Sequence, residues 1–387
     1  MTNEASFQAK QVEFLKNYWQ KQPAFFDEGA VADLGIQFKP IIEIQDLMAL
    51  AQRDDVESRL VIFDAEKNQW ILEHGPFEQR KLRRLEKMKG WTLLVQGVNL
   101  YSSEADKLLR QFSFVPYARL DDLMISFSPE GGTVGPHFDH YDVFLLQGMG
   151  AKNWKVSEQK DRTLLENVPL KILRSFDTTQ SWNMQTGQML YLPPHLAHYG
   201  TALNQGMTYS IGFRAPTARE VADSFLTYLQ DNLDELALKG QYEDPNLVRQ
   251  IHPAEISTEL IHKYGQLLQQ IVWNENMITH FVGQYLTEPK HNVFFNTPKK
   301  ELTFSQFKME LYSAHVKLPL TTQMLFFNNM IFMNGEGVIC ADDDIGILTE
   351  LADKRNLLIN KEISKELMAL FYEWYKNGFI RILRAAT

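Results

Sequence analysis

Short runs of hydrophobic residues follow one another closely between residues 91 and 216, separated by glycine, proline and polar residues. No long helical pattern interrupts them. Many short strands at such spacing predict an antiparallel sandwich or barrel of the jelly-roll type. The predicted strands cover residues 91–98, 123–127, 143–147, 154–156, 189–192 and 207–213.

The N-terminal part of the chain predicts two helices followed by a hairpin. A short amphipathic stretch at residues 14–22 ends at Pro23, because proline lacks a backbone donor and disfavours helix in the residue before it. Apolar residues at helical spacing predict a second helix over residues 43–53. The hairpin is formed by predicted strands at residues 59–63 and 69–72 around the polar turn 64–68.

The pattern becomes helical after Pro216. Thr217 and Glu220 have the spacing of a capping box, which begins a helix that Gly240 ends. A helical segment of this kind either covers the sheet or pairs with a second copy of itself, and the sequence leaves both open. The next predicted helices begin near Pro253 and cover residues 278–285.

The C-terminal part resembles a winged-helix module. It follows a linker-like segment at residues 287–300 and has the order helix, hairpin, helix, short strand, with Asn334-Gly335 as the hairpin turn. Because it lacks a strong basic face, we expect it to bind protein and not DNA. The helices and the last strand are predicted at residues 304–314, 364–376 and 379–383.

Length and charge narrow the classes of function. A chain of 387 residues exceeds one ordinary core and predicts two or three domains. The net charge of -9 argues against a nonspecific grip on nucleic-acid backbone and suits a basic partner, although solubility explains the same charge equally well. No signal peptide or membrane-spanning run is present, so we expect a cytoplasmic protein without membrane contact. The single cysteine, Cys340, leaves nitrogen and oxygen atoms as ligands for any metal.

The candidate chemistry lies at His137 and Asp139. In an extended strand, residues two apart point to the same face, so an imidazole and a carboxylate converge. One further histidine would complete the facial set of two histidines and one carboxylate that suits non-heme Fe(II). His195 and His198 compete for that place, because they are three residues apart and only one can point inward from an extended chain. The same alternation turns His140 away.

Lys152 and Ser126 are candidates for holding a 2-oxoglutarate cosubstrate. This molecule chelates iron through its 2-oxo acid end and needs a cation for its distal carboxylate, and Lys152 follows the Asp139 strand after a glycine turn. Ser126 lies two residues before Ser128 on the preceding strand and offers a hydroxyl donor. A lone lysine is more often solvated and a lone serine more often structural, so both assignments depend on the metal site.

Four segments carry a family resemblance: FLKNYWQKQP, GPHFDHYDVFLLQGMGAKNWKV, YLPPHLAHYG and YSIGFRAP. Together they resemble the JmjC-type ribosomal oxygenases of the cupin superfamily, and more closely the bacterial members that 3-hydroxylate an arginine of large-subunit ribosomal protein sixteen. The similarity is specific up to Pro216 and continues more loosely to the C-terminus.

The resemblance implies Fe(II), 2-oxoglutarate and O₂ as cofactor and cosubstrates. It implies the metal ligands His137, Asp139 and, in the PPxxxH arrangement, His198 in preference to His195. It places the cation that binds 2-oxoglutarate at Lys152 and a serine that contacts the cosubstrate at Ser126. Bacterial relatives often carry arginine in place of this lysine, so the loss of the bidentate fork implies a different cosubstrate affinity.

The resemblance also implies an α+β architecture with a mainly β core. We expect a JmjC catalytic domain with a double-stranded β-helix (jelly-roll or cupin fold) at residues 1–216, a helical dimerisation domain at 217–290 and a C-terminal winged helix at 291–387. The expected partners are a second copy of the chain and a basic, arginine-bearing loop of a ribosomal protein. Acidic residues expected to grip the arginine are Asp121, Asp122, Glu130 and Asp142, each of which is individually more often a plain surface residue.

Two other classes of function remain open on the sequence. The first alternative is a cupin-fold isomerase or hydrolase that uses another divalent metal. An aerobic requirement for iron and inhibition by a 2-oxoglutarate analogue would argue against it. A non-catalytic, ribosome-associated scaffold protein would keep its role after alanine replaced His137 or Asp139. The ligand set together with Lys152 favours the oxygenase, because a binding module does not need that constellation.

Overall fold

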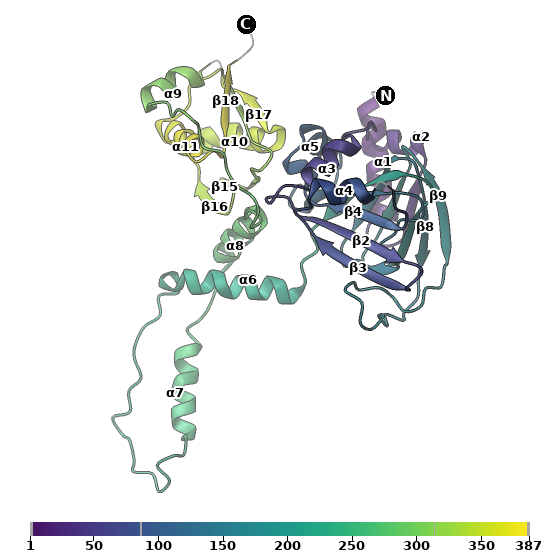
Figure 1. Cartoon of the computed structure of the whole chain (residues 1–387). Coiled ribbons are helices and arrows are strands. Elements are labelled where there is room, and N and C mark those ends of the chain that lie inside the picture. Colours follow the sequence, from purple (N-terminus) through teal and green to yellow (C-terminus); the bar gives the residue numbers. More distant parts are fainter. Residues whose placement is uncertain (1–2, 86, 313, 385–387) are drawn as a thin grey trace. The chain divides into compact units, whose positions relative to one another are not determined.

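The chain forms two compact units in the computed structural model, which describes residues 3–85, 87–312 and 314–384 (Figure 1). The first unit comprises Met1–Ala215, Lys290–Asn296 and Leu318–Thr321. The second comprises Pro216–Pro289, Thr297–Lys317 and Thr322–Thr387. The division of the second unit into a helical domain and a winged-helix domain stays a prediction.

Two antiparallel sheets build the first unit (Figure 1). The larger has the strand order β1-β10-β7-β12-β5-β4-β2-β3, and the smaller has the order β6-β11-β8-β9. Side chains of β7 and β10 pack against those of β8 and β9, so the sheets form two walls of a flattened barrel, as the strand pattern predicts. The strands are β1 Ala24–Phe26, β2 Ser58–Asp64, β3 Gln69–His74, β4 Trp91–Val95, β5 Leu120–Ser128, β6 His137–Phe138, β7 Val143–Met149, β8 Ala151–Ser157, β9 Gln180–Gln185, β10 Met189–Leu192, β11 Ala197–Ala202 and β12 Gly206–Phe213.

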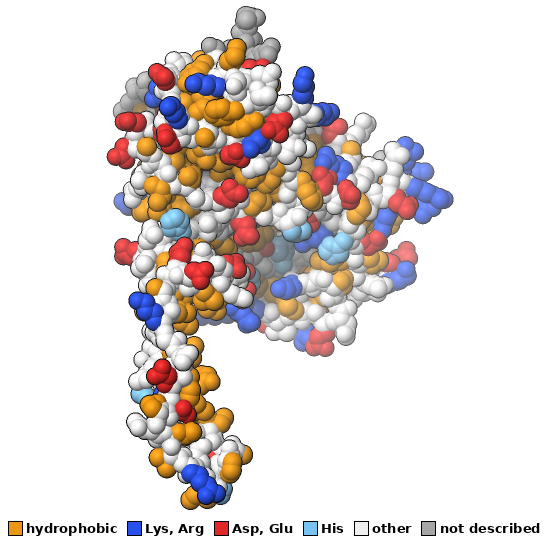
Figure 2. All heavy atoms as spheres, turned by 90° about the vertical axis from the view of Figure 1, so that its left-hand side faces the viewer, with side chains coloured by type: hydrophobic (Ala, Val, Ile, Leu, Met, Phe, Trp, Pro, Cys, Tyr) orange, Lys and Arg blue, Asp and Glu red, His pale blue; other side chains and the backbone are white. Residues whose placement is uncertain are grey.

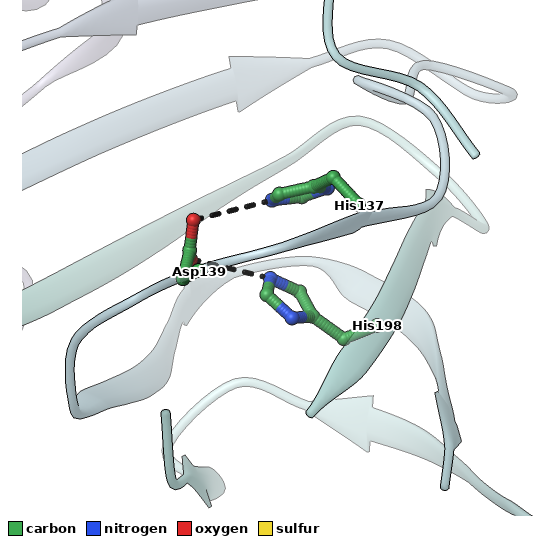
Figure 3. A group of neighbouring side chains, drawn as sticks. All are labelled: His137, Asp139 and His198. Carbon is green, nitrogen blue, oxygen red and sulfur yellow. Dashed lines mark ion pairs between the residues drawn. The ribbon is translucent and has the colours of Figure 1, made fainter. Parts of the chain in front are cut away.

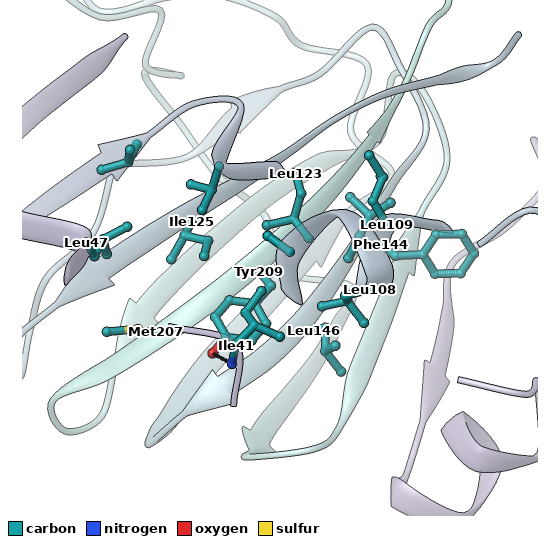
Figure 4. Close-up of a cluster of buried hydrophobic side chains, with 14 of the residues drawn as sticks. Ile41, Leu47, Leu108, Leu109, Leu123, Ile125, Phe144, Leu146, Met207 and Tyr209 are labelled. Carbon is teal, nitrogen blue, oxygen red and sulfur yellow. Dashed lines mark hydrogen bonds between the residues drawn. The ribbon is translucent and has the colours of Figure 1, made fainter. Parts of the chain in front are cut away.

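Helices from the N-terminal half cover the outer face of the larger sheet. They are α1 Asn3–Asn17, α2 Glu28–Asp33, α3 Ile44–Leu50, α4 Gln79–Leu85 and α5 Ser103–Arg110, with a short 3-10 helix, η1, at Val98–Leu100. Ile125, Phe144 and Tyr209 point to this face and are buried in one cluster with Leu47 of α3 (Figure 4). The backbone N–H of Ile41 donates to the Tyr209 hydroxyl over 3.5 Å, so the polar atom in this core has a partner. Truncating such side chains costs about 2–5 kcal/mol each, so this layer fixes the sheet.

The inner face of the larger sheet has an apolar region and a neighbouring polar region. Leu145 of β7 and Leu190 of β10 pack with Trp154 and Val156 of β8. On β12, Ser210 lies opposite Leu145 and therefore points to the same inner face. The apolar contacts hold the two sheets together, and the hydroxyl-bearing strands beside them line the part of the interior that carries the site.

The second unit begins with helices and ends with two small sheets. The hydroxyl of Thr217 accepts a hydrogen bond from the Glu220 N–H, and the Glu220 carboxylate accepts one from the Thr217 N–H, which is the predicted capping box. Asn334 and Gly335 have φ values of 52° and 87°, as a two-residue hairpin turn requires. The sheets have the orders β17-β13-β18 and β14-β15-β16. The elements are α6 Ala218–Asp231, η2 Leu233–Leu236, α7 Thr258–Leu268, α8 Glu275–Thr287, α9 Phe304–Leu311, β13 Ala314–Lys317, β14 Met324–Phe327, β15 Met330–Met333, β16 Glu336–Ile339, α10 Asp342–Lys354, β17 Asn356–Leu358, α11 Lys365–Lys376 and β18 Arg381–Arg384.

Some elements differ from the prediction. Helix α1 begins at Asn3, whereas the prediction started at residue 14. The first turns of the helix are mostly polar, so they lack the apolar stripe from which a helix is predicted. Helix α7 begins after its cap at Ser257, not near Pro253. Helix α10 was not predicted, since its first turn consists of aspartates, which suit a helix N-terminus but are also typical of a loop. Among the described helices, none is both long and apolar enough to cross a bilayer.

Candidate metal centre

His137, Asp139 and His198 come together where β6 pairs with β11. The two strands are antiparallel, and His137 lies directly opposite His198. One possible ligand atom from each of the three residues lies within 4.8 Å of the other two. Nε2 of His198 is 3.4 Å from Oδ2 of Asp139, and Nε2 of His137 is 3.9 Å from Oδ1 (Figure 3). Three donor atoms, one each from β6, from the residue just after it and from β11, therefore lie close together.

Hydrogen bonds to the backbone fix both imidazole rings. Nδ1 of His137 lies 2.9 Å from the carbonyl oxygen of Gly135, and Nδ1 of His198 lies 3.1 Å from that of Leu196. Because a carbonyl oxygen only accepts, each Nδ1 carries a proton and donates it. In the neutral ring, Nε2 then keeps a free lone pair directed at the site, the arrangement found in metal-bound histidines.

The charge states of these groups suit a divalent cation. Burial, followed by repulsion from His198, lowers the pKa of His137 to about 4, so this ring is neutral near pH 7. Burial alone would raise the pKa of the Asp139 carboxyl, but the hydrogen bond and charge interaction with His198 and the charge of His137 outweigh it and lower the pKa to about 2. A neutral imidazole and an ionised carboxylate are the forms that bind metals.

Strand β8 carries Lys152 on the same inner surface. Val156 lies opposite His198 and Trp154 lies opposite Gly200, so Lys152, two residues before Trp154, points to the same side. Nζ of Lys152 stands 4.7 Å from the centre of the Trp154 ring. Burial lowers the pKa of Lys152 to about 8. Within the described residues this ammonium has no hydrogen bond and no ion pair, and a buried cation of this kind needs an anion.

Ser126 of β5 also faces the interior. It lies opposite Thr208 of β12, which in turn lies opposite Gln147 of β7. Leu145, two residues before Gln147, packs against β8, and this contact identifies the face as the inner one. Thr208 donates to Oε1 of Gln147 over 3.2 Å, whereas the buried Ser126 hydroxyl has no hydrogen-bond partner in the described part of the chain. Ser126 is thus free to bind a small polar molecule.

These residues fit Fe(II) together with 2-oxoglutarate. Two imidazoles and one carboxylate on one side of an ion leave the opposite positions open. The side chains of His137 and Asp139 keep 24% and 22% of their surface exposed, whereas that of His198 is buried, so two of the three ligands are reached from outside. Lys152 adds a buried cation, and Nε1 of Trp154 is a buried donor without a partner among the described residues. An anion rich in oxygen atoms satisfies both.

His195 and His140 lie outside the trio. His195 is exposed in the turn before β11 with a φ of 67°, so it does not follow the strand alternation from which its orientation was predicted. Its Nδ1 lies 3.4 Å from Nδ1 of the exposed His140. The structure therefore brings His198, and not His195, to His137 and Asp139.

The four predicted acidic residues all have partners inside the chain. Asp142 is fully buried, which prevents it from touching the guanidinium of another protein. Asp122 is buried as well and accepts hydrogen bonds from Gln96 and from the backbone of Gly97. The other two form ion pairs, Asp121 with Lys290 at 2.9 Å and Glu130 with Lys89 at 2.6 Å.

Asp142 instead accepts several buried hydrogen bonds inside the chain, a role that the sequence did not predict. Oδ1 of Asp142 accepts a hydrogen bond from the Tyr191 hydroxyl over 2.6 Å, and Oδ2 accepts hydrogen bonds from Gln20 at 2.9 Å and Arg119 at 3.3 Å. The loop that starts at the ligand Asp139 therefore ends at a buried, multiply bonded carboxylate. The sequence signal was a second aspartate close behind the HxD triplet, and nothing in it indicated the partners, which lie far apart in the chain.

Comparison with known proteins assigns the family. Residues 107–221 match the JmjC domain, and residues 266–381 match the ROXA-like winged helix. Over 331 residues the chain is 32% identical to the ribosomal protein uL16 3-hydroxylase of Escherichia coli, an alignment that covers 84% of each protein. The chain belongs to the JmjC-domain ribosomal oxygenase family. A probable ribosomal oxygenase of Haemophilus influenzae is 36% identical over 214 residues, which cover 54% of this chain and 51% of that protein.

Solved structures of this ribosomal oxygenase family agree with the fold. The crystal structure of E. coli YcfD matches with a TM-score of 0.81 and 28% sequence identity, covering 96% of this chain and 97% of that one. The same protein in complex with cobalt and 2-oxoglutarate matches with a TM-score of 0.78 over the same shares of the two chains. The predictions of a JmjC or cupin β core and of a C-terminal winged helix are therefore confirmed.

Proposed function

We propose that this chain is an Fe(II)- and 2-oxoglutarate-dependent oxygenase that hydroxylates an arginine of large-subunit ribosomal protein uL16. The observation that carries the proposal is the combination of the His137, Asp139 and His198 trio with the buried Lys152, which has no ionic partner among the described residues, on one inner surface. The similarity to a uL16 3-hydroxylase over most of both chains supports the choice of substrate. An enzyme acting on a ribosomal protein works in the cytoplasm.

The residues divide the work of catalysis between them. His137, Asp139 and His198 hold Fe(II) on one side, and Lys152 binds the distal carboxylate of 2-oxoglutarate with Ser126 as a hydrogen-bond donor. With these groups bound, the iron centre supplies the oxidation: 2-oxoglutarate and O₂ give succinate and CO₂, and one oxygen atom enters a substrate C–H bond. The chain's own task is to fix these molecules and to exclude water from the inner surface.

The substrate fits the charge of the chain. A net charge of -9 attracts a basic ribosomal protein and raises the rate of encounter. Since Asp142 and Asp122 are buried, the arginine must be gripped by other acceptors at the mouth of the site.

The test uses purified protein with Fe(II), 2-oxoglutarate and a peptide of the arginine-bearing loop of uL16. We expect succinate and a peptide heavier by one oxygen atom, and His137→Ala should abolish both. A peptide that stays unmodified while 2-oxoglutarate is consumed would exclude this substrate. Activity that a 2-oxoglutarate analogue leaves unchanged would point to another metalloenzyme class, and a cellular role that survives His137→Ala would point to a scaffold protein.

The helical segment at residues 217–290 is proposed as the dimerisation domain. Helix α7 is amphipathic, yet none of its residues is buried, and Ile261, Tyr264 and Leu268 remain 62%, 56% and 63% exposed. Figure 2 shows hydrophobic side chains exposed along the segment at the bottom of the view. An amphipathic helix of this length is marginal unless its apolar side is covered, and a second copy of the chain would cover it.

Light scattering of the purified protein tests the dimer. We expect the mass of two chains for the wild type and of one chain for Ile261→Glu/Leu268→Glu. The control, Glu259→Gln, changes an exposed residue of the same helix and should stay dimeric. A wild-type mass of one chain at micromolar concentration would contradict the proposal.

A further inference from the structure

Helix α4 carries a stripe of cations that the catalytic site does not use. Arg80, Arg83 and Arg84 have the spacing i, i+3 and i+4, which places them on one side of the helix, and Lys87 lies in a turn just beyond the helix end at Leu85. All four are exposed, whereas Leu82 and Leu85 on the opposite side are buried in the core of the first unit. We call these four residues the α4 stripe. Figure 1 places the helix beside strand β4 of the larger sheet.

The charges of the α4 stripe have no ionic partner in the part of the chain that the structure describes. No member forms an ion pair with any other residue that the structure describes, although the neighbouring cations do: Lys81 pairs with Glu73 and Lys89 with Glu130. Like charges three and four residues apart repel one another, and a cation in the first helical turn opposes the helix dipole. The stripe therefore destabilises its own helix, and a counter-charge from outside would relieve that repulsion.

A basic ribosomal protein cannot be the partner of this surface. It is attracted by the negative charge of the chain as a whole and repelled by a local row of arginines. The partner must carry regularly spaced negative charges, and arginine, which supplies three of the four cations, binds phosphate oxygens through two parallel hydrogen bonds.

We propose that the α4 stripe is a docking surface for RNA phosphates, used when the substrate protein is presented together with RNA. The choice of RNA rests on the proposed function, because a ribosomal protein has RNA as its natural companion. The net charge of -9 opposes binding to nucleic acid over most of the surface, but a local stripe of four cations without an ionic partner among the described residues is enough to contact successive phosphates. Contacts to phosphates alone carry no sequence information, so the stripe would add affinity for RNA without selecting a sequence.

RNA fits the stripe better than an anionic membrane does. A helix that lies on a bilayer inserts an apolar face into the lipid while its basic face meets the head groups. The apolar face of α4 is already committed to the protein core through Leu82 and Leu85. The exposed side offers charge without an apolar anchor, which suits a phosphate backbone.

The experiment measures binding of a fluorescent single-stranded RNA of mixed sequence by anisotropy at several salt concentrations, without iron or 2-oxoglutarate. The test variant is Arg80→Gln/Arg83→Gln/Arg84→Gln/Lys87→Gln. The matched control, Lys10→Gln/Lys16→Gln/Lys39→Gln/Lys107→Gln, removes the same charge from exposed positions of the same unit. We expect the wild type and the control to bind alike. The test variant should bind RNA more than roughly tenfold more weakly at low salt. Its slope of log K against log salt should be less negative by about 3.

Two results would overturn the proposal: RNA binding by the test variant equal to that of the wild type, or wild-type binding to vesicles containing phosphatidylserine but not to RNA. Melting curves of both variants ensure that a loss of binding is not a loss of fold. Because no turnover is measured, failure of RNA binding leaves the proposed hydroxylation untouched, and failure of hydroxylation leaves RNA binding measurable.

Discussion

Gly200 lies directly beneath the side chain of Lys152. A Cβ atom built on Gly200 would stand 2.8 Å from Cε of Lys152 and 2.7 Å from Cζ3 of Trp154, closer than side chains approach one another. Because Gly200 of β11 has no side chain, the space above it is filled by the side chain of the buried Lys152 of β8.

Gly200→Ala should displace Lys152 and Trp154 together. We expect a loss of stability of about 1–3 kcal/mol from overpacking and a weaker affinity for 2-oxoglutarate. Chemical unfolding and a cosubstrate titration of the Mn(II)-loaded protein measure the two effects. Gly265→Ala is the control, because the position has open space around it on α7 and should be neutral or slightly stabilising. An unchanged cosubstrate affinity in Gly200→Ala would separate Lys152 from 2-oxoglutarate binding.

The affinity for 2-oxoglutarate should fall with rising pH. In the free protein Lys152 loses its proton as the pH passes about 8, whereas a bound carboxylate raises the pKa of the ammonium. The complex then holds one proton more than the free protein, so binding weakens up to about tenfold per pH unit above pH 8. Lys152→Arg stays charged throughout, and its affinity should be flat between about pH 7 and pH 9. A wild-type profile as flat as that of the arginine variant would refute the assignment.

Metal binding should stabilise the wild-type protein against heat. Co(II) or Mn(II) at about 100 times its dissociation constant adds about 2.7 kcal/mol if it binds only the folded state. His137→Ala and His198→Ala should lose this gain, since each leaves two ligands. His140→Ala removes an exposed histidine next to the site and should keep it. Differential scanning calorimetry with and without metal measures the effect, and equal gains in all variants would disprove the ligand set.

The buried hydrogen bond between Tyr191 and Asp142 should support the metal loop. Burial, together with this bond, raises the pKa of the Tyr191 hydroxyl, so it remains a donor at all physiological pH values. Tyr191→Phe and Asp142→Asn should each cost about 1–3 kcal/mol, and the double variant should cost less than their sum.

Metal affinity provides the second measurement on this pair. Asp142→Asn should bind Mn(II) more weakly, because the loop from Asp139 loses its anchor. Asp161→Asn is the control, since this carboxylate is exposed and accepts hydrogen bonds from Thr163 and Ser175, away from the metal ligands in the chain. If the stability losses of Tyr191→Phe and Asp142→Asn were additive and the metal affinity were unchanged, Asp142 would have no role in supporting the metal site.

The sequence predicted the parts of the site that depend on strand alternation and left open those that depend on turns. His137 and Asp139 could be paired by spacing alone. The choice between His195 and His198 could not, because a left-handed turn residue at His195 breaks the alternation. The role of Gly200 was invisible as well, since it depends on which strand of the smaller sheet lies next to β11.

The same distinction explains the missed elements. Strand β9 is polar and exposed along most of its length, so it has no hydrophobic run from which a strand could be predicted. The anchoring of Asp142 by Gln20 and Tyr191 joins three distant segments, and such contacts follow from topology and not from local pattern.

Strand β6 is only two residues long, and two residue pairs join it to β11. An ion held by His137 on one strand and His198 on the other would act as a clamp on this shortest ladder. Molecules without metal should then unfold locally at this corner first and be cleaved there by proteases. The supply of iron would thus set the lifetime of the enzyme in the cell as well as its catalytic rate.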